Sequence, residues 1–320
     1  MKLFIFGSTG DLVKNKVLPA LHEFKDLNIY VLGRKSLDNE QYNKEYCKTC
    51  SKEFKLRLNY MQVSFEKSIH KQTEDFLDKD GINYFYISMP PDFIIKILNG
   101  ILEVKEKGFK VQILIEKPFG SSLKEAESIA KIIEKDKLER NTYLSDHYLF
   151  KKNIFSLNKK NFKKLKLVSL EKVGLEGRGY YDSAGALKDM IQSHFFNILH
   201  KITEFSEKDL LIKAIKLGQY KEYRQELGKE SETETYITIY FEINGKEIEF
   251  ETGKRYPQKE SFIEIDGVRK EINSEGEDYV NLFDNFFRQK KENFPTIHNS
   301  IVNWKIIEEI QKKKPGLFFY

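Results

Sequence analysis

The sequence predicts a two-domain α/β protein, with a parallel sheet and covering helices over residues 1–150 and an α+β domain over residues 151–320. In the first part, short apolar runs typical of buried strands alternate with helical patterns, which is the arrangement of a parallel sheet. In the second part, alternating apolar and polar runs follow one another directly, which favours a mostly antiparallel sheet. A chain of 320 residues is long enough for two such cores.

The composition excludes several classes of protein. Apolar residues make up 40% of the chain and aromatic residues 13%, as in a folded protein. The net charge of +5 is spread along the chain, so no basic block indicates nucleic-acid binding. The apolar runs are shorter than the ~20 residues of a membrane-spanning helix, and the first strand pattern begins at Lys2, leaving no room for a signal peptide. We expect a cytoplasmic protein without a nucleic-acid or membrane partner, whose charge is compatible with a small anionic ligand.

The two cysteines, Cys47 and Cys50, form a single CxxC motif. A structural zinc ion needs a second pair of ligands at a suitable spacing, and the neighbouring sequence offers none. We therefore expect two reduced thiols near the surface and no metal site.

The first strand, Lys2–Phe6, runs into a glycine turn and then a helical pattern that continues to Leu21. The order of strand, glycine turn and helix places free N–H groups and the positive end of a helix toward a phosphate group, as in a Rossmann-type sheet. The spacing is GxxG rather than GxGxxG, so an ordinary turn stays an alternative. The cofactor-binding residues expected here are Gly7, Ser8, Thr9, Gly10, Asp11 and Leu12.

The second strand, Ile29–Leu32, ends at Gly33, Arg34 and Lys35. In such a sheet this strand end meets the adenosine ribose, where an acidic residue binds the 2′-hydroxyl and an arginine pairs with a 2′-phosphate. Arg34 therefore favours NADP, and NAD stays open as a second cofactor. The alternative is that both cations serve only solubility.

Three further strands are expected at Asn83–Ser88, Val111–Ile115 and Thr142–Ser145, with helices at Phe93–Lys107 and Leu123–Glu134. Their carboxyl ends deliver Pro90, Lys117 and Asp146. Because the carboxyl ends of parallel strands share one edge of a sheet, these residues should lie at the same edge as Gly7 and Arg34. The sequence thus predicts a ligand site along this edge.

The stretch from Glu171 to His200 runs from a glycine-rich polar segment into an apolar helix that bears Asp189 and His194. At about 100° per residue these two side chains lie roughly 140° apart on an α-helical wheel, so they cannot pair but could line one wide cleft. A single histidine on an apolar helix is more often a core residue than a catalytic one. The other motifs of the chain favour a functional role.

The remainder of the second domain reads as strands, turns and two closing helices. Asn244 and Gly245 predict a hairpin with a primed turn, and the polar segment Tyr220–Glu232 is the expected mobile loop. Strands are expected at Lys164–Val173, Leu210–Leu217, Thr235–Ile243, Glu247–Glu251, Ser261–Ile265 and Val268–Ile272, and helices at Val280–Phe287 and Val302–Ile310.

Several motifs together resemble one known family. The segments GSTGDL, EKPFG and DHYLxK are followed by GRGYYDxxGxxxDMxQxH and then by TGK at Thr252–Lys254. In order and rough spacing they are similar to the glucose-6-phosphate dehydrogenase family, although the chain is shorter than is typical of it. The resemblance implies NADP-dependent oxidation of an aldose phosphate at C1 to the lactone, and it allows a homodimer as one assembly.

The resemblance also implies roles for individual residues. His194 would act as the general base and Asp146 would orient it, which suits an imidazole whose pKa lies near neutrality. Lys117 would touch both sugar and cofactor. The substrate would be bound at its phosphate by His147, Tyr148, Lys151, Lys254 and Lys259, and at its hydroxyls by Glu171 and Asp189.

Two other functions remain open from the sequence. An oxidoreductase of the glucose-fructose oxidoreductase type also combines a Rossmann domain with an EKP lysine and a helix-borne Asp/His pair, and would act on another carbon of a sugar or nucleotide sugar. A non-catalytic protein that binds NADP and a sugar phosphate is the third reading. It does not explain Asp146 and His194, because binding alone needs no proton acceptor.

Overall fold

The structure, a computed structural model, describes residues 1–135, 137–177, 179, 181–273 and 276–320. The chain divides into two compact units, of which the first comprises Met1–His147 and Gly276–Ile297 and the second Tyr148–Glu275 and His298–Tyr320. The sequence pattern contained no sign that Gly276–Ile297 rejoins the first unit. Each unit is described separately below.

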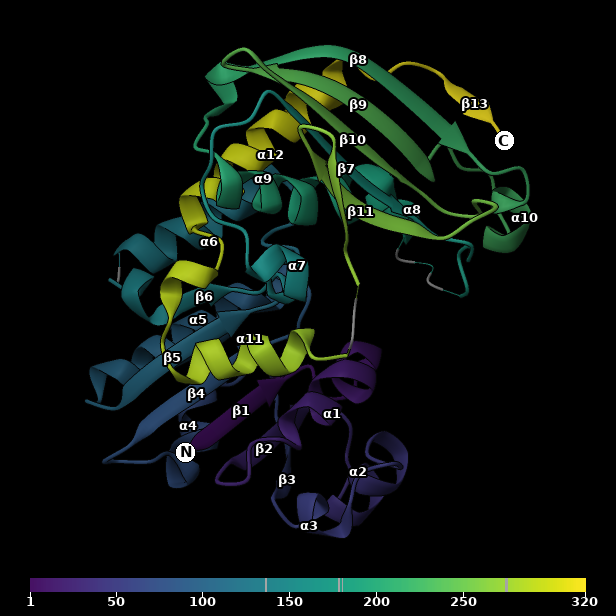
Figure 1. The fold of residues 1–320 in the computed structure, drawn as a ribbon. Coiled ribbons are helices and arrows are strands. Elements are labelled where there is room, and N and C mark those ends of the chain that lie inside the picture. The colour runs from purple at the N-terminus through teal and green to yellow at the C-terminus, as the bar shows by residue number, and fades with distance from the viewer. Residues whose placement is uncertain (136, 178, 180, 274–275) are drawn as a thin grey trace. The chain divides into compact units, whose positions relative to one another are not determined.

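The first unit contains a parallel sheet, as predicted, which has six strands (Figure 1). The strands are β1 (Lys2–Phe6), β2 (Asn28–Gly33), β3 (Leu58–Gln62), β4 (Ile82–Ile87), β5 (Lys110–Ile115) and β6 (Thr142–Leu144). Their order, β3-β2-β1-β4-β5-β6, is that of dinucleotide-binding sheets, in which ligands bind where the strand order reverses. That point lies between β1 and β4. The edge strand β3 was not predicted, because its residues alternate weakly.

Helices cover this sheet, and one of them comes from a distant part of the sequence. The helices of the first unit are α1 (Leu18–Leu21), α2 (Asn39–Tyr46), α3 (Lys52–Lys55), α4 (Ile69–Thr73), α5 (Pro91–Glu106), α6 (Leu123–Lys135) and α11 (Asp278–Phe287). Phe286 of α11 packs edge-on against Tyr84 of β4 and Tyr143 of β6, with ring centroids 5.3 and 5.1 Å apart. The amphipathic pattern predicted α11 but not its partner.

The second unit is built on a sheet that is mostly antiparallel, as predicted, and has seven strands, of which Leu317–Phe319 was not predicted. Its strands are β7 (Lys164–Leu170), β8 (Leu210–Gln219), β9 (Tyr236–Ile243), β10 (Lys246–Gly253), β11 (Glu260–Ile265), β12 (Val268–Glu271) and β13 (Leu317–Phe319). Two pairs, β7 with β10 and β8 with β13, are parallel. Asn244 and Gly245 both have positive φ, at 49° and 77°, which confirms the primed turn of the hairpin.

A helical layer packs on one face of this sheet. The π-helical segment η5 (Leu187–Phe195) and the helix α9 (Phe196–Ile202) belong to this layer. The other helices are α7 (Lys152–Phe155), α8 (Tyr181–Ala186), α10 (Tyr223–Leu227) and α12 (Ile297–Lys312). Phe195 and Phe196 meet Phe250 of β10 edge-on, with ring centroids 5.3 and 5.4 Å apart. This apolar contact fixes η5 and α9 on the sheet.

The expectation of two reduced thiols is wrong, since Cys47 and Cys50 form a disulfide. Helix α2 ends at Tyr46, and the amide of Cys50 donates to the carbonyl of Cys47 at 3.1 Å in the turn that follows. The turn brings the two Cα atoms to 5.2 Å, which lies within the range that a disulfide requires.

The segment predicted as a mobile loop, Tyr220–Glu232, contains α10 and is tied to α8. The carboxylate of Asp182 accepts hydrogen bonds from Ser231 at 2.5 Å and from Tyr223 at 3.2 Å, and pairs with Lys229 at 2.7 Å. Burial alone would raise the pKa of Asp182, but Lys229, Ser231 and Thr233 hold this pKa down at about 2. The segment is therefore held by charge and hydrogen bonds as well as by the buried rings of Tyr220 and Tyr223.

This network predicts a pH-dependent stability. Because the pKa of Asp182 is about 2 in the folded protein and ordinarily 3.8, its contribution is complete above pH ~4 and disappears as the pH falls toward ~2. We expect Asp182→Asn to lower the free energy of unfolding by about 2 kcal/mol at neutral pH. Denaturant unfolding at a series of pH values should show the two proteins converging in acid. A constant difference would contradict the assignment.

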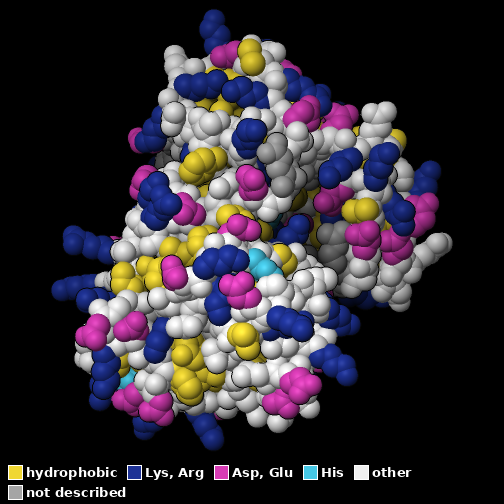
Figure 2. Space-filling model, turned by 60° about the horizontal axis from the view of Figure 1, so that its bottom comes forward, with side chains coloured by type: hydrophobic (Ala, Val, Ile, Leu, Met, Phe, Trp, Pro, Cys, Tyr) yellow, Lys and Arg dark blue, Asp and Glu magenta, His cyan; other side chains and the backbone are white. Residues whose placement is uncertain are grey.

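On the face shown in Figure 2, basic and acidic side chains are interspersed. The small net charge of the chain predicts such a surface. Among the residues that the structure describes, no helix combines the length and the apolar character needed to span a bilayer.

Candidate active site

The glycine turn after β1 requires glycine at its first position. Gly7 has a φ of +82°, and a Cβ atom there would lie 2.0 Å from the carbonyl oxygen of Ser88, just after β4. The amide of Gly10 donates to the carbonyl of Gly7 at 3.0 Å and closes the turn before the helical segment that comprises η1 (Val13–Val17), which is π-helical, and α1. The backbone therefore passes close to the point where the strand order reverses, as a phosphate-binding turn must.

Ser8 supports this turn from inside the fold. Its amide and its hydroxyl both donate to the carbonyl of Leu32, at 3.3 and 2.9 Å, while its own carbonyl accepts the Tyr42 hydroxyl at 2.8 Å. Ser8 is fully buried, so its side chain shapes the turn. The other predicted cofactor residues, Thr9, Gly10, Asp11 and Leu12, are half-buried or exposed.

The end of β2 presents two cations with different surroundings. Arg34 is exposed, and its guanidinium lies over the ring of Phe93 in α5 at 5.4 Å. Lys35 instead donates to the Tyr46 hydroxyl at 2.6 Å and pairs with Glu45 at 3.3 Å. The Arg34 guanidinium is thus held against the Phe93 ring, whereas the Lys35 ammonium is engaged with Tyr46 and Glu45. Pro90 precedes α5 as its N-cap residue.

A buried carboxylate that sequence reasoning missed connects the ends of three strands. Glu116 accepts hydrogen bonds from Tyr86 at 2.6 Å, from Ser145 at 2.8 Å and from the amide of Lys117 at 3.2 Å. Burial raises the pKa of Glu116. In the sequence, Glu116 could have been recognised as an acidic residue that directly follows an apolar strand and precedes Lys117. A carboxylate buried at such a position needs hydrogen-bond partners.

Asp146 and His147 follow β6, at the same sheet edge as Lys117. The amide of Ser145 donates to the carbonyl of Ile115 at 2.8 Å and continues the parallel pairing to this point. Asp146 is buried, and the ring of His147 stacks on Tyr279 with centroids 5.4 Å apart. The first unit therefore gathers Gly7, Arg34, Pro90, Lys117 and Asp146 at the carboxyl ends of its strands, as predicted from the sequence pattern.

In the second unit, three predicted residues form one stack. The ring of Tyr148 lies on His194 with centroids 4.2 Å apart, and the ammonium of Lys151 lies 3.7 Å from the centre of the same tyrosine ring. The Tyr148 hydroxyl is 3.4 Å from the hydroxyl of Ser169 on β7. His194 and Lys151 are both buried. The Lys151 ammonium and the His194 imidazole thus both pack against the ring of Tyr148.

The helix that bears Asp189 and His194 is π-helical, which corrects the separation of roughly 140° estimated for an α-helix. In η5 the amide of Phe196 bonds to the carbonyl of Ile191, five residues earlier. The spacing of five between Asp189 and His194 is therefore one hydrogen-bond repeat of this helix, and such segments are frequent at functional sites.

The start of η5 is set by a glycine and a glutamate. Gly185 has a φ of +64°, and a Cβ atom there would lie 2.4 Å from the carboxylate of Glu234. That carboxylate accepts the amide of Leu187 at 3.2 Å and pairs with Lys314 at 2.6 Å. An acceptor at a helix N-terminus satisfies one of its free amides. Glu234, which the sequence did not single out, thus fixes where the helix begins.

Asn303 of α12 supports the middle of the same helix. Its amide group donates to the carbonyl of Gln192 at 3.2 Å and to the side chain of Asn197 at 3.1 Å, and its oxygen lies 2.9 Å from Nε2 of His200. Burial lowers the pKa of His200 to about 4, so this ring is neutral near pH 7. A buried polar network of this kind holds η5 in one position.

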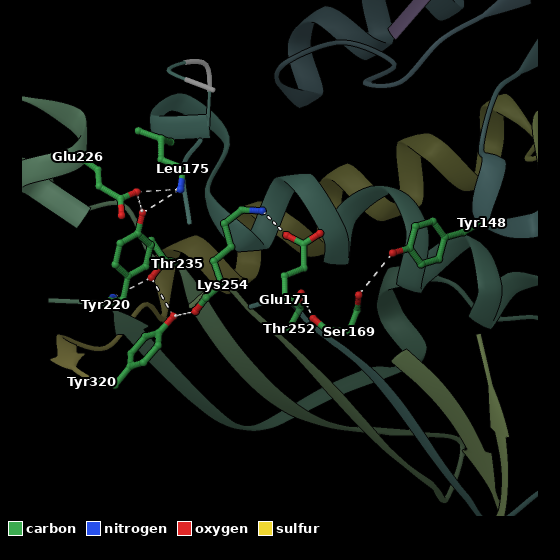
Figure 3. Close-up of polar contacts among 10 residues, drawn as sticks. All are labelled: Tyr148, Ser169, Glu171, Leu175, Tyr220, Glu226, Thr235, Thr252, Lys254 and Tyr320. Carbon is green, nitrogen blue, oxygen red and sulfur yellow. Dashed lines mark hydrogen bonds and ion pairs between the residues drawn. The ribbon is translucent and has the colours of Figure 1, made fainter. Parts of the chain in front are cut away.

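Glu171 and Lys254 form an ion pair at the ends of β7 and β10 (Figure 3). The ammonium of Lys254 also lies 4.7 Å from the centre of the Tyr181 ring, and Lys254 is only 5% exposed. Burial and then the charge of Asp189 raise the pKa of the Tyr181 hydroxyl. Glu171, Asp189 and Lys254 therefore surround Tyr181, which sequence reasoning missed although it lies in the motif.

The remaining predicted residue, Lys259, is exposed in the turn before β11. Its role in substrate binding stays a prediction. Arg178 and Tyr180 of the glycine-rich motif lie outside the described residues.

The sequence matches two family models and is similar to known enzymes. Residues 4–155 match the family model described as glucose-6-phosphate dehydrogenase, NAD binding domain, and residues 149–216 match its C-terminal domain. The glucose-6-phosphate 1-dehydrogenase of Buchnera aphidicola subsp. Schizaphis graminum is 28% identical over 91% of this chain and 73% of its own length. The Helicobacter pylori enzyme of that name is also 28% identical, over 82% of this chain and 75% of its own length.

Solved structures share the fold. A glucose-6-phosphate 1-dehydrogenase from Mycobacterium avium superposes with a TM-score of 0.82 at 18% identity, covering 100% of this chain and 93% of that one. A myo-inositol dehydrogenase from Corynebacterium glutamicum gives 0.70 at 11% identity, covering 98% and 96%. The two family models together span residues 4–216, and the chain belongs to the glucose-6-phosphate dehydrogenase family.

Proposed function

We propose that this chain oxidises glucose 6-phosphate, or a closely related aldose phosphate, at C1 to the lactone with NADP as cofactor. The observation that carries the proposal is the arrangement in the second unit. There an imidazole and a carboxylate lie on η5, a second carboxylate and a buried lysine follow β7 and β10, and another buried lysine, Lys151, precedes α7 and packs on the ring that stacks with the imidazole. These are the groups needed to bind a phosphorylated sugar and to remove a proton from it.

The residues of the first unit fit a dinucleotide. The turn at Gly7 leaves no room for a side chain, and the helix behind it offers N–H groups to a pyrophosphate. Arg34, supported on Phe93, would pair with a 2′-phosphate. NADP, when bound, supplies the acceptor for a hydride.

His194 would take the proton of the C1 hydroxyl as the hydride leaves C1. A neutral imidazole near physiological pH suits this role, and a carboxylate on its other nitrogen would fix the tautomer and stabilise the imidazolium. We assign that carboxylate to Asp146. The proposal thus requires Asp146 of the first unit to reach His194 of the second.

The remaining assignments follow the charges of the groups. Lys151, His147 and Tyr148 would bind the phosphate, because cations and hydroxyl donors suit an anion of about −2. Lys254 and Lys259 would add to this site. Glu171 and Asp189 would accept hydrogen bonds from sugar hydroxyls, and Lys117 would set the distance between sugar and cofactor.

The proposal is tested by assaying the purified chain with NADP and with NAD against a panel of substrates. The panel contains aldose phosphates, the free aldoses, myo-inositol and nucleotide sugars. Formation of reduced cofactor together with the lactone of an aldose phosphate supports the proposal. Oxidation of a nucleotide sugar or of another carbon would support an enzyme of the glucose-fructose oxidoreductase type instead, and binding without turnover would support a non-catalytic role.

Arg34 should determine the preference for NADP. We expect Arg34→Ala to raise KM for NADP by about 10- to 100-fold, since a charge-assisted hydrogen bond contributes about 1.5–3 kcal/mol. KM for NAD should change less than about threefold, and NAD provides the internal control. Lys35→Ala is the matched variant, because Lys35 is already engaged with Tyr46 and Glu45. An equal loss for both cofactors would contradict the assignment of Arg34.

A further inference from the structure

The hydroxyl of Tyr320 reaches the backbone of Lys254, although the two residues are far apart in the sequence. Tyr320 donates to the carbonyl oxygen of Lys254 at 2.6 Å, and its hydroxyl oxygen also lies 3.1 Å from the hydroxyl of Thr235 (Figure 3). Tyr320 lies outside the motifs and the strand patterns of the sequence. Its place beside a predicted substrate-binding lysine suggests a function.

Strand β13 fixes the position of Tyr320. The strand pairs in parallel with β8, where Phe318 lies opposite Gly218. A Cβ atom at Gly218 would lie 2.8 Å from the ring of Phe318, so the glycine allows this strand to approach. The amide of Tyr320 donates to Gln219 at 3.2 Å, and its carbonyl accepts the amide of Lys221 at 3.1 Å. Both backbone groups of Tyr320 are therefore held.

The ring of Tyr320 is held by other aromatic side chains. Its centroid lies 5.7 Å from that of Tyr236, 6.1 Å from that of Tyr256 and 6.0 Å from that of Phe318. Burial raises the pKa of the Tyr320 hydroxyl to about 12. The hydroxyl therefore keeps its proton at physiological pH and remains a donor.

Lys254 is held both at its backbone and at its ammonium group. Its amide donates to the carbonyl of Thr235 at 3.0 Å, its carbonyl accepts the Tyr320 hydroxyl, and its ammonium lies between Glu171 and the Tyr181 ring. A lysine side chain otherwise loses much rotamer freedom when it is ordered. Fixing the backbone in advance reduces the freedom that substrate binding has to remove.

We propose that Tyr320 is a positioning residue for substrate binding, which acts by fixing the backbone from which Lys254 extends toward the sugar phosphate. This proposal rests on the proposed function. Because Tyr320 supports a binding lysine and not the base, its loss should affect the affinity for the sugar phosphate. The rate of the saturated enzyme and the affinity for NADP, which would bind to the first unit, should not depend on it.

The test is Tyr320→Phe, which keeps the ring and removes only the donor. We expect KM for the sugar phosphate to rise about fivefold, as for loss of one hydrogen bond, while kcat and KM for NADP stay within about twofold. Phe319→Ala is the control on the same strand, since Phe319 is exposed and contacts Arg224, and it should leave all three constants unchanged. Lys254→Gln and the double variant complete a cycle in which the effects should not add.

The outcomes separate the two proposals. If the unaltered chain oxidises no aldose phosphate, the proposed function fails, and the role of Tyr320 fails with it. If the chain is active and Tyr320→Phe has an unchanged KM, or adds its full effect to that of Lys254→Gln, only the role of Tyr320 is overturned. A fall in kcat with a parallel rise in KM for NADP would indicate a general loss of structure and would also overturn it.

Discussion

His194→Asn should lower kcat by about 10²- to 10⁴-fold, the range typical of losing a general base. Asparagine has nearly the same size and keeps a polar group, so the packing of His194 against Tyr148 should largely persist. KM for the sugar phosphate and for NADP should change less than about threefold, because the substitution alters none of the proposed phosphate and cofactor ligands. Steady-state kinetics with both substrates varied measure all three constants.

The same experiment tests the role of Asp146. If Asp146 orients His194, Asp146→Asn should lower kcat strongly by itself but little further in a His194→Asn background, since residues that act as one unit are not additive. His298→Asn is the control, because His298 is an exposed histidine of α12 to which no role in the site is assigned. A kcat of His194→Asn within about threefold of the unaltered chain would remove His194 from the mechanism. Full additivity would separate Asp146 from it.

Gly7→Ala should abolish cofactor binding and destabilise the first unit. A non-glycine residue at this φ costs about 1–2 kcal/mol, and the added Cβ atom would meet the carbonyl of Ser88 at 2.0 Å. Forcing β1 and β4 apart adds roughly 1–3 kcal/mol and moves the turn at which a pyrophosphate would bind. The free energy of unfolding and the KM for NADP both report this change.

Gly108→Ala separates the two causes. Gly108 also has a positive φ, at +91°, but no atom lies within 4 Å of a Cβ added there. This control should lose only the ~1–2 kcal/mol of backbone strain and should bind NADP normally. If Gly7→Ala changes the free energy of unfolding and the KM for NADP no more than Gly108→Ala does, the close approach of the turn to Ser88 does not contribute to stability or to cofactor binding.

The parallel sheet and its site edge could be predicted because each strand carries its own signal. The runs at Lys2–Phe6 and Val111–Ile115 are short and apolar, and the polar residues after them mark the carboxyl ends. Topology then brings those ends together without any knowledge of side-chain contacts. The hairpin at Asn244 was equally local, since its turn needs residues that tolerate positive φ.

The contacts that hold the second half of the site could not be predicted, because they join residues far apart in the sequence. Glu234 begins the helix η5, Asn303 supports it, and Tyr320 fixes the backbone of Lys254. The π-helical form of η5 could not be recognised from the spacing of its apolar residues, because that spacing was interpreted with the 100° per residue of an α-helix. That α11 packs within the first unit could not be predicted either, since its amphipathic face does not specify which sheet it covers.

The measurement that tests the central claim most directly is the initial rate of NADP reduction by glucose 6-phosphate, with the purified chain and its His194→Asn variant compared side by side. The account predicts that the unaltered chain forms NADPH and the lactone in equal amounts and that the variant is at least about 100-fold slower. No reduction of NADP by glucose 6-phosphate or any related aldose phosphate, or equal rates for the two proteins, would contradict it.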